Sequence, residues 1–176
     1  MDEIKLLKPS IDYDEDIMQF RKELLDISDR DGFAGCGKLR HCPTTEAWLK
    51  ELAMYENVAT CPEGSVPSNT YIAVRSSDNR IVGVIDLRHH IDHPILGTWG
   101  GHIGYSVRPS ERNKGYAKEM LRQNLINCRK KNLDKVLVTC SRDNIASEKT
   151  ILANGGVLEK EILVEGEYIK RYWISL

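Results

Sequence analysis

The sequence predicts a single α/β domain, of the α+β kind, with a mixed sheet flanked by helices. Its 176 residues suit one domain. No repeat or linker divides the chain, and segments with helical and strand-like spacing alternate along it. The expected order is strand, two helices, three strands, helix, strand, helix and two strands. We therefore treat residues 1–176 as one domain.

The first half of the chain is expected to supply a strand, two helices and a hairpin. Tyr13 begins a run of apolar residues at helical spacing, and Thr44 or Thr45 can cap a second helix that buries Trp48. A glycine-rich loop lies between the two helices. The predicted elements are a strand over 3–8, helices over 13–28 and from about 46, a loop over 59–69, and strands over 71–74 and 81–85.

The second half alternates strands and helices. Val136-Leu137-Val138 is a continuous apolar run typical of a central strand, and Asn154-Gly155-Gly156 is a strong helix stop. The predicted elements are a strand over 102–107, a helix over 115–130, a strand around 136–138, a helix over 145–153 and two closing strands, the last over 168–174.

Composition excludes several classes of function. The 25 basic residues nearly cancel the 26 acidic ones, so no net field favours nucleic acid or an anionic membrane. No apolar run approaches the length of a transmembrane helix, and the N-terminus lacks the features of a secretory signal. The five cysteines show no metal-ligand spacing. These observations favour a cytoplasmic protein with reduced thiols.

One strand-to-helix junction carries the most chemistry. The strand ends at Pro109, and Gly115 falls in the first turn of the next helix. Such a junction directs free backbone N–H groups and the positive helix end at one point, which suits a pyrophosphate. Arg112 and Lys114 add positive charge, and small Ala117 leaves room. Alternatively, Gly115 merely eases a tight turn, or the loop binds a phosphate of another kind.

The same junction resembles a known family. Val107-x-Pro109-x-x-Arg112-x-x-Gly115-x-Ala117 resembles the [QR]-x-x-G-x-[GA] signature of the Gcn5-related N-acetyltransferase (GNAT) superfamily. Asn144, Ser147 and the later Gly155-Gly156 resemble its second motif. Within the superfamily, the sequences of these two motifs are similar to those of a group of bacterial predicted acetyltransferases. Most members of that group have no assigned substrate.

The resemblance implies the GNAT fold, whose mixed, mostly antiparallel sheet holds a splayed central pair of strands flanked by helices. It also implies acetyl-CoA as co-substrate, with its pantetheine arm between the splayed strands, and no metal. A plain capping role for Asn144 is the alternative to binding pantetheine. The implied coenzyme-binding residues are Tyr105, Ser106, Val107, Arg112, Asn113, Lys114, Gly115, Tyr116, Ala117, Lys118, Asn144 and Ser147.

The implied reaction is direct attack of a neutral primary amine on the acetyl thioester. His102, at the start of its strand, is the candidate base because an ordinary histidine titrates near neutrality. Tyr105 is the candidate acid for the departing thiolate. Many members use a tyrosine where this chain has Ile151, and some use a carboxylate where it has Thr139. The two departures favour an alternative function, a non-catalytic acyl-CoA-binding sensor or regulatory module.

The acceptor side is less specified. Asp86 and His89 follow a neighbouring strand and are expected to line the acceptor pocket. The loops over 31–43 and 60–69 are expected to select the amine, by analogy with the family. His89 and His93 would share a face only on a helix, whereas this segment is expected to continue a strand into a proline-containing loop, so no metal site is expected. The expected partner is a small-molecule or peptide amine, and the superfamily leaves a homodimer open.

Overall fold

The computed structural model describes residues 1–27 and 32–176, and it contains two antiparallel sheets. The first sheet has the order β1-β2-β3-β4, and the second has the order β5-β7-β6. The strands are β1 (Ile4–Leu7), β2 (Ser68–Arg75), β3 (Arg80–Arg88), β4 (Tyr105–Val107), β5 (Lys135–Ser141), β6 (Val157–Val164) and β7 (Glu167–Ser175). The predicted mixed sheet is therefore divided where β4 would meet β5.

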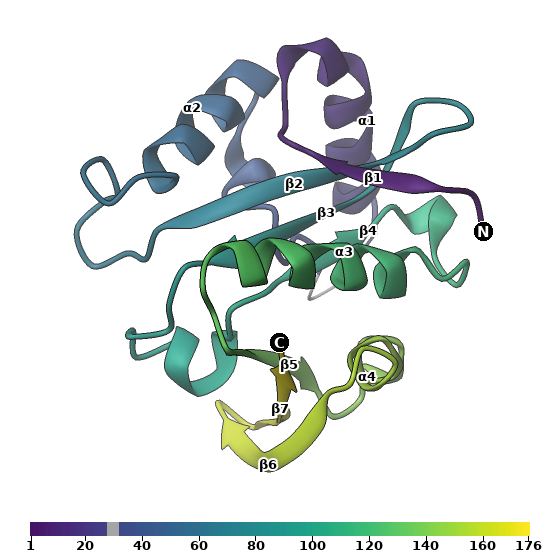
Figure 1. Ribbon diagram of the computed structural model, residues 1–176. Helices are drawn as coiled ribbons and strands as arrows, with labels where there is room; N and C mark the ends of the chain where they lie inside the picture. The colour runs from purple at the N-terminus through teal and green to yellow at the C-terminus, as the bar shows by residue number, and fades with distance from the viewer. Residues whose placement is uncertain (28–31) are drawn as a thin grey trace.

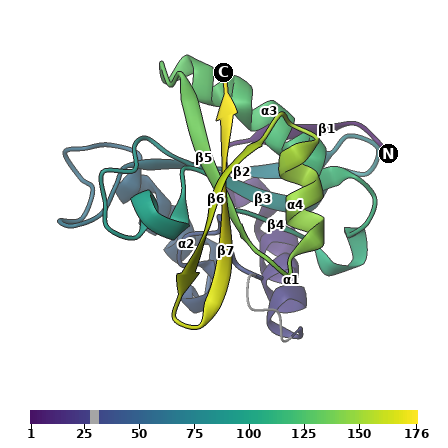
Figure 2. The same ribbon diagram turned by 90° about the horizontal axis from the view of Figure 1, so that it is seen from below.

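Helices cover both faces of the larger sheet. Figure 1 shows α1 and α2 above it, and α3 below it. The smaller sheet and α4 lie on the α3 side, and α4 runs beside β5 and β7 (Figure 2). The long helices are α1 (Asp14–Leu25), α2 (Thr45–Tyr55), α3 (Tyr116–Lys130) and α4 (Ile145–Leu152). Short helical turns occupy Ile11–Tyr13, Leu39–His41, Leu96–Gly100 and Pro109–Glu111.

Two hydrophobic cores result, one on each face of the larger sheet. In the first, α1 and α2 bury Phe20, Leu24 and Trp48 against β2 and β3. In the second, the apolar stripe of α3 that includes Met120 and Leu125 packs between the two sheets. The helix periodicities that predicted these elements therefore also mark the faces that pack.

The glycines of the predicted turns adopt the backbone that their positions require. Gly115 is the N-cap of α3, with a left-handed φ of 87°, so it precedes the helix and does not lie in its first turn as predicted. Gly155 follows α4 with φ 83°. Thr44 caps α2 as expected, because its side chain accepts a hydrogen bond from the Ala47 N–H at 3.2 Å.

Several predicted boundaries move. The second strand starts at Ser68, inside the predicted loop over 59–69. The strand predicted over 102–107 is reduced to Tyr105–Val107. The helix predicted over 13–28 ends at Leu25, and its predicted last residue lies outside the described part of the chain.

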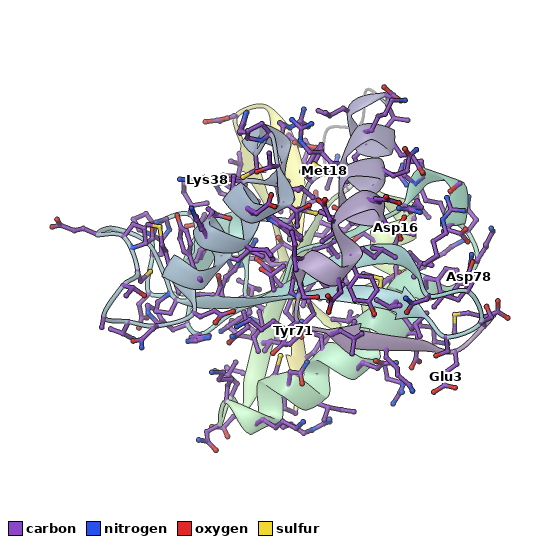
Figure 3. The ribbon with its side chains drawn as sticks, turned by 90° about the horizontal axis from the view of Figure 1, so that it is seen from above. Glu3, Asp16, Met18, Lys38, Tyr71 and Asp78 are labelled. Atoms are coloured by element: carbon purple, nitrogen blue, oxygen red, sulfur yellow. The ribbon has the colours of Figure 1, made fainter. Side chains whose placement is uncertain are left out.

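A buried cation joins α1 to the end of β4. Arg108 is fully buried, donates to Asp16 Oδ1 at 2.6 Å, and lies 5.8 Å from the centre of the Phe20 ring. The other Asp16 carboxylate oxygen accepts the Ile81 N–H at 2.6 Å. These bonds show that Asp16 faces the sheet and fixes α1 over it. Figure 3 labels Asp16 beside that helix.

The state of the cysteines and the length of the helices are two further features of the structure. All five cysteines are free, and Cys36, Cys42, Cys128 and Cys140 are buried. Burial raises the pKa of the Cys36 thiol to about 12, which keeps it protonated. Within residues 1–27 and 32–176, no helix is both long and apolar enough to cross a membrane.

Candidate active site

The two sheets separate at β4 and β5. Each of these strands is the edge of its own sheet, so neither pairs with the other. The segment just before β4 is joined to β5 where the His102 N–H donates to the Leu137 carbonyl at 2.8 Å. The Leu137 N–H returns a bond to His102 Nδ1 at 2.9 Å. The splayed central pair that the resemblance implied is therefore present, and it is closed at the His102 end.

Alternate residues of β4 direct their backbone groups into this split. The Gly104 carbonyl accepts from the Asp86 N–H at 3.0 Å, and the Arg108 N–H donates to Val82 at 2.8 Å. These even-numbered residues of the segment thus face β3. In an antiparallel ladder the intervening residues, Tyr105 and Val107, direct their N–H and carbonyl groups to the opposite edge. That edge is the one left without a strand.

Asp86 and Arg88 explain why β4 is short. Asp86 Oδ1 accepts the Gly104 N–H at 2.7 Å, so a side chain replaces the backbone acceptor there. Its Oδ2 lies 3.0 Å from Arg88 Nε, and Arg88 Nη1 donates to the carbonyls of Gly100 and Gly101. Burial raises the pKa of the Asp86 carboxyl against the opposing effect of Arg88. The pair therefore diverts one ladder hydrogen bond, that of the Gly104 N–H, and holds Gly100 and Gly101 at the closed end of the split.

The turn before α3 presents a row of unused donors. Asn113 and Gly115 both adopt left-handed conformations, with φ of 61° and 87°. The first helical bond runs from the Glu119 N–H to the Gly115 carbonyl. Within the described part of the chain, the N–H groups of residues 113–118 donate to no protein atom. Six successive donors at a helix N-terminus form a strong anion-binding arrangement.

An ion-pair network supports this turn from below. Glu111 is buried and accepts from Arg75 Nη1 at 2.8 Å and from Lys114 Nζ at 2.9 Å. Arg75 also donates to the Tyr116 hydroxyl at 3.3 Å. Burial raises the pKa of Glu111, but the bonds from Lys114 and Arg75 outweigh it and hold that pKa below its ordinary value. Arg112, the other predicted cation, donates from Nε to the Val107 carbonyl at 3.3 Å.

The N-terminal end of α4 faces Tyr105. Asn144 Oδ1 accepts the Ser147 N–H at 3.1 Å, so Asn144 caps the helix as the alternative interpretation expected. The Tyr105 hydroxyl lies 2.6 Å from Ser147 Oγ. Burial raises the pKa of Tyr105 and keeps the phenol protonated at neutral pH. Ile151, one turn further along α4, is fully buried.

His102 is held in a way that bears on its predicted role as a base. Its Nδ1 accepts the Leu137 N–H, so the neutral ring carries its proton on Nε2. Burial lowers the pKa of His102 to about 4. To accept a proton from an amine, the ring would first have to release Leu137. The base role stays a prediction, while its two bonds to Leu137 make His102 a link between the two sheets.

A cavity of about 250 Å³ lies on the other side of β4. Asp86 lines this cavity, whereas His89 does not and instead places Nε2 2.7 Å from Asn69 Oδ1. Their predicted role at the acceptor stays a prediction. Both loops predicted to select the acceptor contribute to its wall. The lining residues are Gly37, Lys38, Glu51, Leu52, Tyr55, Ser65, Val66, Ser68, Thr70, Asp86, Arg88, His93 and Leu96. Figure 3 shows Lys38 beside α2.

The glycine-rich loop packs directly on the β4 segment. A Cβ built on Gly35 would lie 2.1 Å from the Gly104 carbonyl oxygen, and Gly35 has φ 75°. The Ala34 carbonyl accepts from Ser106 Oγ at 2.7 Å. The run Gly32-Phe33-Ala34-Gly35 was the available signal in the sequence, but the contact joins segments about 70 residues apart. Sequence reasoning also missed Glu51 and Thr70, which only the fold brings to the cavity.

Two further predictions concern Thr139 and the histidines. Thr139 Oγ1 donates to the Trp99 carbonyl at 2.5 Å, so this position carries no acidic group beside the split. In the part of the chain that the structure covers, no three metal-ligating side chains gather. His90 and His93 instead accept backbone N–H bonds within their own loop.

Several solved structures with a similar fold are described as acetyltransferases. At 18% identity and a TM-score of 0.64, one is the microcin C7 self-immunity acetyltransferase MccE with acetyl-CoA and AMP, covering 100% of this chain and 94% of that one. A second is RimL, a ribosomal L7/L12 α-N-protein acetyltransferase with coenzyme A, at 16% identity and a TM-score of 0.65. The match covers 98% of this chain and 94% of that one. A third is a SpeG spermidine N-acetyltransferase chimera from Vibrio cholerae and hSSAT, at 14% identity and a TM-score of 0.63. The match covers 98% of this chain and 95% of that one.

The sequence comparisons address the family itself. No curated protein matches the chain. The family model described as an acetyltransferase (GNAT) domain matches residues 13–157, which include the split, the turn before α3 and the start of α4. That match covers well over half of the sequence, and it shows that the chain belongs to the GNAT acetyltransferase family and thus to the acetyl-CoA-dependent N-acetyltransferases.

Proposed function

We propose that this protein transfers the acetyl group of acetyl-CoA to a primary amine, of a small molecule or of an exposed amino group, by direct attack. The observation that carries the proposal is the row of free N–H donors over 113–118, next to the open edge of β4. A diphosphate on that turn would leave the attached pantetheine arm free to extend along the strand edge. Backbone groups of Tyr105 and Val107 would pair with it as a strand would.

The residues around the split have separate roles in this proposal. The amides of 113–118 bind the diphosphate, and Lys114 and Arg112 add positive charge near it. The Asn144 side chain, which also caps α4, bonds the pantetheine arm. A backbone N–H of β4 polarises the thioester carbonyl, as an oxyanion-hole donor does.

The chemical step follows from these positions. The neutral amine nitrogen attacks the thioester carbon, the C–S bond breaks, and the sulfur leaves as a thiolate. Tyr105 is the proposed proton donor to that thiolate, because its protonated hydroxyl reaches the same α4 face on which Ile151 replaces the family's tyrosine. The proton lost by the nitrogen passes to a base or to water.

A second candidate is a GNAT module that binds acyl-CoA without catalysis. The observation in its favour is that Ile151 is buried and Thr139 is bonded to a backbone carbonyl, so neither position supplies a proton-transfer group. Titration calorimetry with acetyl-CoA tests binding, and release of free thiol against a panel of amines tests transfer. Binding with amine-dependent thiol release supports the transferase. Binding without release favours the module, and no binding rejects both.

A further inference from the structure

The acceptor cavity contains two carboxylates in different states. Asp86 is buried and already occupied, by the Gly104 N–H and by Arg88. Glu51 comes from the side of α2 and is half-buried. Among residues 1–27 and 32–176, no lysine or arginine forms an ion pair with Glu51, which accepts a long hydrogen bond of 3.4 Å from the Lys38 N–H. Glu51 is therefore the carboxylate with unused capacity.

Other polar groups in the cavity also lack partners. Thr70 is 8% exposed and lines the cavity, yet its hydroxyl forms no hydrogen bond with any described residue. Ser68 and Tyr55 line the same space with hydroxyl groups that are likewise unbonded to the described chain. These hydroxyl groups face the open space of the cavity, so they are available to bond a ligand there. Hydroxyl oxygens and a carboxylate are the acceptors that an ammonium group needs.

The remaining charges in the cavity do not cancel that of Glu51. The Arg88 guanidinium pairs with Asp86 through Nε and donates to two backbone carbonyls through Nη1. Lys38 is exposed at the rim and lies outside ion-pair distance of Glu51. Burial raises the pKa of Glu51 against a smaller opposing effect of Lys38, as expected for a carboxylate without a bound cation.

The cavity extends from this carboxylate toward the reacting end of β4. Asp86 lines it and bonds Gly104, the residue before Tyr105. The glycine-rich loop spans the same interval, because Gly35 packs on Gly104 while a Cβ on Gly37 would lie 2.9 Å from Glu51 Oε2. The apolar side chains of Leu52, Val66 and Leu96 form the wall between the ends.

We propose that Glu51 determines specificity, by binding a second positive group of the acceptor, distal to the amine that is acetylated. The preferred acceptor is then a small amine with an apolar middle and a cationic far end. This inference rests on the proposed function, because it treats the cavity as the acceptor site. An amine with a carboxylate at its far end would meet Glu51 as a like charge and be rejected.

Three probes with a common aminopentyl group isolate the far end: 1,5-diaminopentane, hexylamine and 6-aminohexanoate. Their terminal groups are positive, neutral and negative. Calorimetric Kd values are measured for each probe on the protein saturated with coenzyme A, so the readout does not depend on turnover. For the wild type we expect the diamine to bind about tenfold more tightly than hexylamine, and the amino acid most weakly.

The Glu51→Gln variant should remove the tenfold preference for the diamine while leaving the Kd for hexylamine and for coenzyme A within twofold. Glu46→Gln is the matched control, because Glu46 is exposed on the same helix and does not line the cavity. It should keep the wild-type order of affinities. Equal affinities for the three probes in the wild type, or an unchanged preference in Glu51→Gln, would overturn the proposal.

Failure of the proposed function looks different. Selective binding of the diamine without thiol release would leave the role of Glu51 intact and remove the transferase assignment. Thiol release with no discrimination between the three probes would do the reverse. The two outcomes therefore separate the substrate selection from the chemistry.

Discussion

The two sides of β4 are built by different means. On the β5 side, backbone groups from two adjacent segments, β4 and the turn over 113–118, form the site. On the other side, side chains from four distant segments surround a cavity. Backbone-built sites demand glycines and left-handed turns at fixed spacing, and these are visible in a sequence. A side-chain cavity tolerates many residue types, so it can change its ligand while the first site stays the same.

The largest effect is expected where a side chain enters the backbone-built site. Gly115→Glu should weaken acetyl-CoA binding more than a hundredfold, because it brings a carboxylate to the diphosphate amides and strains a φ of 87°. Calorimetry measures the loss. Gly166→Glu is the matched control, since Gly166 has φ 85° and open space around it. Equal affinity losses in both variants would show that strain alone is responsible.

The contact between the glycine-rich loop and the β4 segment, at Gly35 and Gly104, should be almost as sensitive to substitution. Gly35→Ala would force a Cβ to 2.1 Å from the Gly104 oxygen, so we expect a loss of roughly 3 kcal/mol in unfolding free energy. Urea denaturation gives the value. Gly64→Ala has a similar φ of 76° with nothing within 4 Å and should lose only about 1 kcal/mol. Similar losses for the two variants would mean that the loop does not press on β4.

His102, which links the sheets at the closed end of the split, should make the stability of the protein fall in acid. The pKa of His102 is about 4 in the folded chain and 6.5 ordinarily, so the unfolded chain takes up the proton first as pH falls. Stability that is fully present above pH 6.5 is therefore lost between 6.5 and 4, by on the order of 3 kcal/mol.

His102→Asn keeps an acceptor for the Leu137 N–H but cannot titrate. Denaturation curves at several pH values should show that the variant lacks this part of the acid dependence, while the effect of the carboxylates remains in both proteins. Parallel pH profiles for the two proteins would contradict the buried neutral ring.

The smallest effect concerns the proposed acid. Tyr105→Phe removes the hydroxyl at Ser147 without leaving the split empty, so acetyl-CoA affinity should stay within twofold while kcat falls about tenfold. Steady-state thiol release measures kcat, and Tyr71→Phe is a control because Tyr71 lies on β2 and packs toward α3. Unchanged turnover in Tyr105→Phe would remove this residue from the chemistry.

The same contrast explains what the sequence could predict. Gly115, Asn144 and the helix periodicities predicted the coenzyme half, because local backbone geometry restricts the residue types allowed there. The closed end of the split depends on the bonds between His102 and Leu137, which join segments 35 residues apart and which no spacing reveals. Glu51 and Thr70 come to the same cavity only when α2 packs on β2. The sequence could therefore indicate which loops border the proposed acceptor site, but not which side chains would bind the acceptor.

The central claim is that the amides of 113–118 bind the diphosphate of the coenzyme. Amide hydrogen exchange measured by NMR, with and without coenzyme A, tests it directly. We expect exchange at 113–118 to slow at least tenfold on binding, because the six N–H groups acquire acceptors, while Gly166 in the distant β6–β7 turn is unaffected. Tight binding of coenzyme A with unchanged exchange over 113–118 would contradict the account.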